Sequence, residues 1–123
     1  MKTKVLIIKH DTKAATELRQ QLAKNKDICV CDIISDGGNA VSAIRAQNPN
    51  VILLDFLLPN LDGLEATKII RELSATVPII AQSAFAYEHD VKAAMEAGCN
   101  DFIAKPIAQS KLKEVINKWL TTE

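Results

Sequence analysis

The sequence predicts an α/β protein, a doubly wound five-stranded parallel sheet flanked by five helices. Two observations lead to this prediction. Short apolar runs of strand length alternate with amphipathic stretches of helical period about five times along the chain. Turn-forming residues separate these stretches, and no linker, repeat or low-complexity segment interrupts them. Because such alternation is typical of βαβ crossovers, we expect parallel strands with helices on both faces of the sheet.

Five apolar runs are the predicted strands. The third is the clearest, because four bulky apolar residues, closed by Asp55 and a turn signal, indicate a strand buried on both faces. The predicted strands are Lys4–Ile8, Cys29–Ile34, Val51–Leu54, Pro78–Ala81 and Asp101–Ala104.

The helices are predicted from apolar residues at helical spacing. In the first, Ala15, Leu18 and Leu22 share one face. The predicted helices are Thr12–Lys24, Ala40–Gln47, Leu64–Leu73, Tyr87–Ala97 and Gln109–Leu120. Five strands and five helices fit a flavodoxin-like sheet of order 2-1-3-4-5, whose crevice opens beside strands one and three.

Composition and charge exclude several classes of protein. Lys+Arg and Asp+Glu both number 15, which argues against direct binding of nucleic acid or an acidic membrane surface. There is no apolar stretch of ~20 residues and no signal peptide, so we expect a cytoplasmic protein. The three cysteines form no paired framework, and Cys29 and Cys31, on one face of a strand, indicate packing more than a metal or redox pair.

Four chemistry-bearing residues stand at the carboxyl ends of predicted strands: Asp11, Asp55, Ser83 and Lys105. Open α/β sheets bind their ligands at this edge. A carboxylate nucleophile, a second acid for a cation, a hydroxyl and an ammonium together describe a phosphoryl-transfer site. The simpler interpretations are a turn residue for Asp55, an N-cap of the first helix for Asp11, a surface lysine and a loop serine.

These residues and their neighbours resemble the receiver domain of response regulators, the phosphoacceptor module of two-component signalling. The resemblance covers essentially the whole chain, and we expect residues 1–123 to be a single receiver domain without an output domain. Its motifs, in order along the chain, are Asp11, Asp55 with Pro59 and Asp62-Gly63, Ser83-Ala84, and Phe102 with Lys105-Pro106.

The resemblance implies that Asp55 accepts a phosphoryl group from a phosphohistidine. It implies a Mg²⁺ ion bound by Asp11, Asp55 and the backbone carbonyl of Leu57, a cation suited to carboxylate and phosphate oxygens. Lys105 and Ser83 would contact the phosphoryl oxygens. The module is then not an enzyme, although it assists its own phosphotransfer and dephosphorylation.

The resemblance also implies how a signal leaves the site. The hydroxyl of Ser83 would move toward the phosphoryl group, and Phe102 would turn inward, although a plain core role for Phe102 is equally open. Pro106 matches the proline that follows the site lysine across a cis bond. Trp119 is expected either to cover the core or to anchor an interface.

His10 departs from the family pattern, which usually has two adjacent acids after the first strand. Imidazole prefers softer metals, so His10 is a doubtful metal ligand. Three interpretations stay open: weaker Mg²⁺ binding that weakens further when His10 is protonated, a site better served by Mn²⁺, or a surface imidazole without a role.

The expected partner is a histidine kinase or a histidine phosphotransfer protein, with the receiver monomeric or transiently dimeric. The alternative is a pseudo-receiver that acts through protein contacts without phosphorylation. An FMN protein is disfavoured because residues 9–13 contain no glycine, and a haloacid-dehalogenase-like phosphatase because its D-x-D pattern is absent. The segment Ala84–Ile107 resembles receivers fused to hybrid histidine kinases, so excision from a longer protein is also open.

Overall fold

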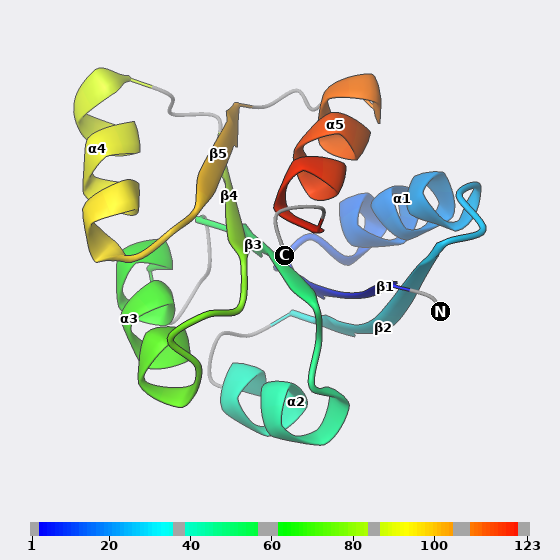
Figure 1. The fold of residues 1–123 in the computed structure, drawn as a ribbon, viewed down its shortest axis with the longest axis horizontal. Helices are drawn as coiled ribbons and strands as arrows, with labels where there is room; N and C mark the ends of the chain where they lie inside the picture. Colours follow the sequence, from blue (N-terminus) through cyan, green and yellow to red (C-terminus); the bar gives the residue numbers. More distant parts are fainter. Residues whose placement is uncertain (1–2, 36–38, 57–61, 84–86, 105–108, 121–123) are drawn as a thin grey trace.

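The sheet has the predicted architecture. The computed structural model describes residues 3–35, 39–56, 62–83, 87–104 and 109–120. Five parallel strands are hydrogen-bonded in the order β2-β1-β3-β4-β5 (Figure 1). They are β1 (Thr3–Ile8), β2 (Ile28–Ile34), β3 (Val51–Asp55), β4 (Ile79–Ser83) and β5 (Asp101–Ala104).

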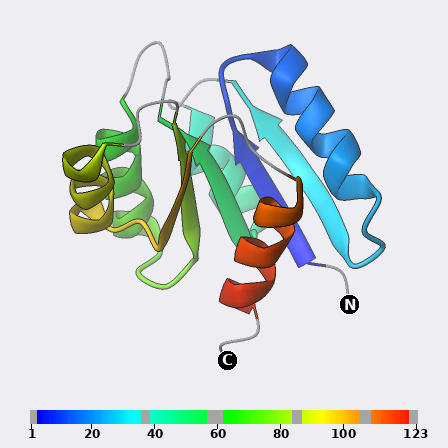
Figure 2. The same cartoon turned by 90° about the horizontal axis from the view of Figure 1, so that it is seen from above.

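Helices cover both faces of the sheet. They are α1 (Thr12–Ala23), α2 (Ala40–Gln47), α3 (Gly63–Leu73), α4 (Glu88–Ala97) and α5 (Gln109–Leu120). Figure 2 shows α1 and α5 on one face and α2, α3 and α4 on the other. The predicted bounds of α2 and α5 are confirmed, and those of the other three helices differ by one residue at one end. None of the helices in the described part of the chain has the length and apolar character needed to cross a membrane.

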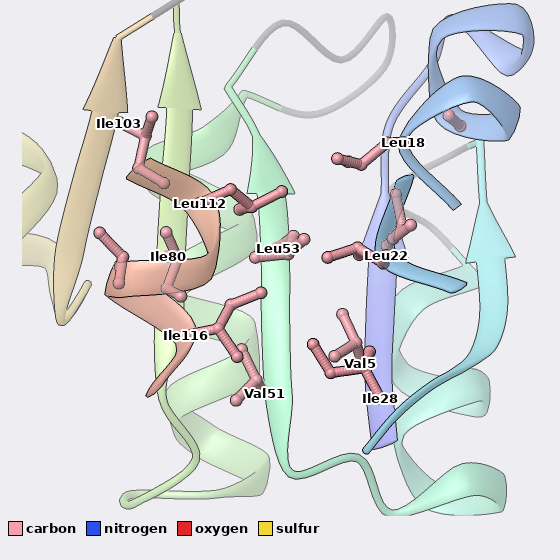
Figure 3. Close-up of a cluster of buried hydrophobic side chains, with 13 residues drawn as sticks. Val5, Leu18, Leu22, Ile28, Val51, Leu53, Ile80, Ile103, Leu112 and Ile116 are labelled. Atoms are coloured by element: carbon pink, nitrogen blue, oxygen red, sulfur yellow. The ribbon is translucent and has the colours of Figure 1, made fainter. Parts of the chain in front are cut away.

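The core consists of two layers separated by the sheet. Side chains alternate along each central strand, so Val5 and Ile7 face α1 and α5 while Leu6 and Ile8 face the other helices. Every residue of β3 is buried, as expected of a central parallel strand. Figure 3 shows the layer beneath α5 and α1, with Leu53 of β3 at its centre.

Two strands extend further toward the carboxyl edge than the sequence predicts. The ladder between β3 and β4 reaches Asp55, which pairs with Gln82, and the ladder between β4 and β5 reaches Ser83, which pairs with Ala104. The prediction that β4 spans Pro78–Ala81 is therefore wrong at both ends, since the strand runs from Ile79 to Ser83. Polar residues are seldom buried in a strand, which is why the pattern ended too early.

The cysteine pair of β2 is only partly a packing feature. The register between β1 and β2 shifts so that Val5 pairs with Val30 and Leu6 with Asp32, which leaves Cys31 as the extra residue. Cys31 packs against the core, and its thiol donates to the Val5 carbonyl at 3.6 Å. Cys29 is exposed, so the packing interpretation is wrong for that residue.

Trp119 covers one end of the core. Its ring packs against the α1 and α5 layer, and its Nε1–H donates to Asp101 Oδ2 at 3.0 Å. Of the two roles expected for this residue, the structure therefore favours covering the core.

Candidate functional site at the carboxyl edge of the sheet

Asp55 lies at the centre of the candidate site. It is the last residue of β3, the middle strand, and only 4% of its surface is exposed. A buried carboxylate is costly unless charged or hydrogen-bonding groups compensate it. Among the described residues, its neighbours lie at the ends of the two adjacent strands, β1 and β4.

Lys9 is the described cation that compensates Asp55. Its Nζ lies 3.1 Å from Asp55 Oδ2, and the lysine is itself only 6% exposed. The N–H of Lys9 donates to the Ile34 carbonyl at 2.8 Å, which continues the ladder beyond the end of β1. Because Ile7 pairs with Leu53, the same register places Lys9 opposite Asp55 on the α1 and α5 face.

Gln82 lies on the other side of Asp55. It pairs with Asp55 in the ladder between β3 and β4 and is 1% exposed. Its Nε2 has no hydrogen-bond partner, whereas most buried polar groups have one. Lys9, Asp55 and Gln82 thus form a buried polar row at the carboxyl ends of three adjacent strands, and no role for Lys9 or Gln82 was predicted from the sequence.

Asp11 caps helix α1. Its Oδ1 accepts hydrogen bonds from the backbone N–H groups of Lys13 and Ala14, each at 3.1 Å. The capping role weighed for this residue is therefore confirmed, and the cap holds an exposed carboxylate beside the carboxyl edge. His10, between Lys9 and Asp11, is exposed.

Ser83 and Phe102 border one cavity on the opposite face of the sheet. Ser83 ends β4 and is 5% exposed, and Phe102 on β5 is half-buried in the layer formed with α3 and α4. The Phe102 ring meets that of Phe56 edge-on, with centroids 6.3 Å apart. Both Ser83 and Phe102 line a cavity of about 270 Å³ that α3 and α4 also border. Phe102 is therefore a core residue with open space beside it.

The Asp62-Gly63 motif has a structural explanation. Asp62 is the N-cap of α3, and its Oδ1 accepts from the Glu65 N–H at 2.8 Å. A Cβ at Gly63 would collide with the Phe56 ring. The pair therefore starts α3 while letting Phe56, the residue after Asp55, pack directly on the helix backbone.

The remaining predicted residues lie outside the described part of the chain. They are Leu57, Pro59, Ala84, Lys105 and Pro106. Within the described residues, no group of three or more His, Cys, Asp or Glu side chains could hold a metal ion. The donor types at the edge, the carboxylates of Asp11 and Asp55, nevertheless suit Mg²⁺, which is commonly held by one or two carboxylates with water and phosphate oxygens.

Comparison with known proteins agrees with this arrangement. The family model of the response regulator receiver domain matches residues 5–117. The chain belongs to the receiver family. This receiver is 31% identical to the chemotaxis protein CheY of Bacillus subtilis, over 98% of this chain and 99% of that protein.

Solved receivers share its fold. The receiver domain of sensor histidine kinase PA1611 from Pseudomonas aeruginosa, with magnesium in its active-site cleft, superposes with a TM-score of 0.88 at 31% identity. That match covers 99% of this receiver and all (100%) of the other chain.

Many relatives are much longer. The receiver is 32% identical to the osmosensing histidine protein kinase SLN1 of Saccharomyces cerevisiae over 94% of its own length, but spans only 10% of SLN1. Across the first four curated relatives it spans between 10% and 44% of their length. Two-component signalling is therefore the shared context, while the activities of those whole proteins belong to them.

Proposed function

We propose that this receiver accepts a phosphoryl group on Asp55 from a phosphohistidine donor, a histidine kinase or a histidine phosphotransfer protein. The observation that supports this most strongly is the buried carboxylate of Asp55 at the carboxyl end of the central strand, with the Lys9 ammonium 3.1 Å away. A carboxylate held in one position and beside a positive charge is prepared for attack on a negatively charged phosphoryl group.

In the proposed step, a carboxylate oxygen of Asp55 attacks the phosphorus atom. A P–O bond forms, the P–N bond to the donor imidazole breaks, and the imidazole leaves with the bonding electrons and takes up a proton. The product is an aspartyl phosphate on this receiver. Lys105 and Ser83 would stabilise the charge on the phosphoryl oxygens.

Asp11, Asp55 and the Leu57 carbonyl would hold the Mg²⁺ ion. When bound, the ion would neutralise charge on the phosphoryl oxygens. The helix cap restrains Asp11 through Oδ1 alone, and its other carboxylate oxygen takes no part in those two hydrogen bonds. His10 contributes no hard oxygen, so this site lacks at least one carboxylate of the usual receiver pattern.

The signal would leave through Ser83 and Phe102. The cavity that both line gives the Phe102 ring room to turn when Ser83 moves toward the phosphoryl group. Phe102 has no hydroxyl, so the two positions of its ring would differ in packing alone.

Acetyl phosphate tests the proposal without a partner protein. The receiver is incubated with acetyl phosphate and Mg²⁺, with Mn²⁺ in parallel, and its intact mass is measured. We expect a gain of one phosphoryl group that is lost in Asp55→Asn. No gain with either metal, on a folded receiver, would favour the pseudo-receiver that acts through protein contacts.

A further inference from the structure

The described charges around Asp55 differ from those expected of a typical receiver. The family usually places two acids after the first strand, which together with the phosphoacceptor make three carboxylates. Here the two residues that directly follow β1 are Lys9, whose buried ammonium contacts Asp55, and His10, which is exposed, and the next acid, Asp11, caps α1. Beside Asp55, the described part of the site therefore has a buried cation at a position where a receiver usually has an acid.

We propose that Lys9 is a resident counter-ion of Asp55, which weakens divalent-cation binding and provides part of the positive charge that phosphorylation needs. The role of Lys9 in phosphorylation rests on the proposed function. Its effect on cation binding does not depend on that function.

The position of Lys9 carries the proposal. The lysine follows β1 directly, and its backbone N–H donates to the Ile34 carbonyl at 2.8 Å, so the sheet holds the backbone from which its side chain extends. Its Nζ contacts Asp55 Oδ2 at 3.1 Å, with 8% of its side chain and 5% of that of Asp55 exposed. Solvent screens such a pair weakly, so a divalent ion that approaches Asp55 meets the repulsion of a nearby ammonium.

Gln82 adds an independent observation. Its buried Nε2 has no hydrogen-bond partner, and it belongs to the residue that pairs with Asp55 on the next strand. A donor without an acceptor is costly in the resting protein. It gains an acceptor if additional negative oxygen arrives at Asp55, so the polar row is suited to an anion bound with little help from a metal.

Calorimetric titration with Mg²⁺ tests the counter-ion directly. We expect weak binding to the unphosphorylated receiver. Binding should be about tenfold tighter or more in Lys9→Met, which removes the charged terminal group and keeps an unbranched side chain one atom shorter. Lys26→Met is the matched control, because Lys26 is exposed and precedes β2 at the opposite edge of the sheet. Equal Mg²⁺ affinity in all three proteins would overturn the proposal.

A separate measurement shows whether Lys9→Met is folded. If Lys9→Met is unfolded without metal, Mg²⁺ should restore its structure, as measured by circular dichroism, at concentrations that leave the melting temperature of the wild type unchanged. The double variant Lys9→Met, Asp55→Asn should fold without metal and lose the tightened Mg²⁺ binding. A double variant that still binds Mg²⁺ more tightly than wild type would also overturn the proposal.

Phosphorylation by acetyl phosphate in excess EDTA tests whether Lys9 provides part of the positive charge that phosphorylation needs. Acetate leaves as the P–O bond to Asp55 forms, so no further reactant is needed. We expect slow phosphorylation of the wild type and of Lys26→Met, and a rate about tenfold lower in Lys9→Met. Equal rates in EDTA would remove Lys9 from the reaction. Absence of product even in saturating Mg²⁺ would instead refute the proposed function, and the Mg²⁺ titration would still decide the counter-ion.

Discussion

Removal of the Lys9 charge is expected to destabilise this receiver strongly, and removal of both charges much less. Lys9→Met leaves Asp55 as a buried carboxylate that has lost a cation 3.1 Å away. Breaking a buried ion pair by removing one partner typically costs about 3–5 kcal/mol. Because both side chains are less than one-tenth exposed (8% and 5%), solvent can recover little of this loss.

The coupling between the two residues separates this effect from a general packing defect. In the double variant Lys9→Met, Asp55→Asn neither charge remains, and replacing a buried pair by uncharged groups is often neutral or stabilising. We therefore expect the free energy of unfolding of the double variant to lie within about 1–2 kcal/mol of that of the wild type. This loss is much smaller than the sum of the losses in the two single variants.

The assay is urea denaturation at pH 7 in the presence of EDTA, followed by circular dichroism and fluorescence of the single tryptophan, Trp119. Lys26→Met, which changes the same charge on an exposed side chain, should lie within about 0.5 kcal/mol of the wild type. A loss below about 1 kcal/mol in Lys9→Met, or additive losses in the double variant, would refute the ion pair as a significant interaction.

Three further predictions concern other parts of the receiver. Arg71 donates to the carbonyls of Gly98 and Val77 at 2.9 and 2.7 Å. In urea denaturation, Arg71→Ala should therefore lower the free energy of unfolding by about 2–4 kcal/mol. Arg71→Lys should not restore this stability, because lysine lacks the planar guanidinium fork. Gln82→Leu removes the unpaired donor, so it should raise the urea midpoint by an amount equivalent to about 1 kcal/mol. The same variant should be phosphorylated more slowly by acetyl phosphate, and an unchanged rate would exclude a role for the Gln82 amide in phosphorylation. Burial raises the pKa of the Cys99 thiol, so its contribution to stability is fully present below the ordinary thiol pKa and is lost as the pH rises through the raised value. Thermal melts from pH 7 to 10 should show this decline, and Cys99→Ala should decline less steeply, since Cys31, whose pKa burial also raises, remains.

Most of the fold could be predicted because its periodicities are strong. The run Val51–Leu54 has no helical period and is closed by an acid, and in the structure all of β3 is buried. Strand order then followed from the alternation of strands and helices, with few topologies to consider. Asp55 could be placed at the ligand-binding edge for the same reason, because it directly follows a central strand.

The polar row was missed because its members look like interruptions of strands. Lys9 and Gln82 each directly follow an apolar run, so the sequence pattern leaves both outside the predicted strands. The alternation of side chains along a strand could have indicated their burial. Lys9 lies two residues after Ile7, and Gln82 two residues after Ile80, and both isoleucines face the core beneath α1 and α5. The placement of Asp55 between Lys9 and Gln82 depends on the register of three strands. The sequence pattern alone does not determine this register.

The location of the phosphoryl group tests the phosphorylation of Asp55 most directly. The receiver is treated with acetyl phosphate and Mg²⁺, reduced with borohydride, which converts an aspartyl phosphate to homoserine, and its peptides are sequenced by mass spectrometry. We expect homoserine at position 55 and nowhere else, with none in Asp55→Asn. Homoserine at another aspartate, or none in a folded receiver, would contradict it.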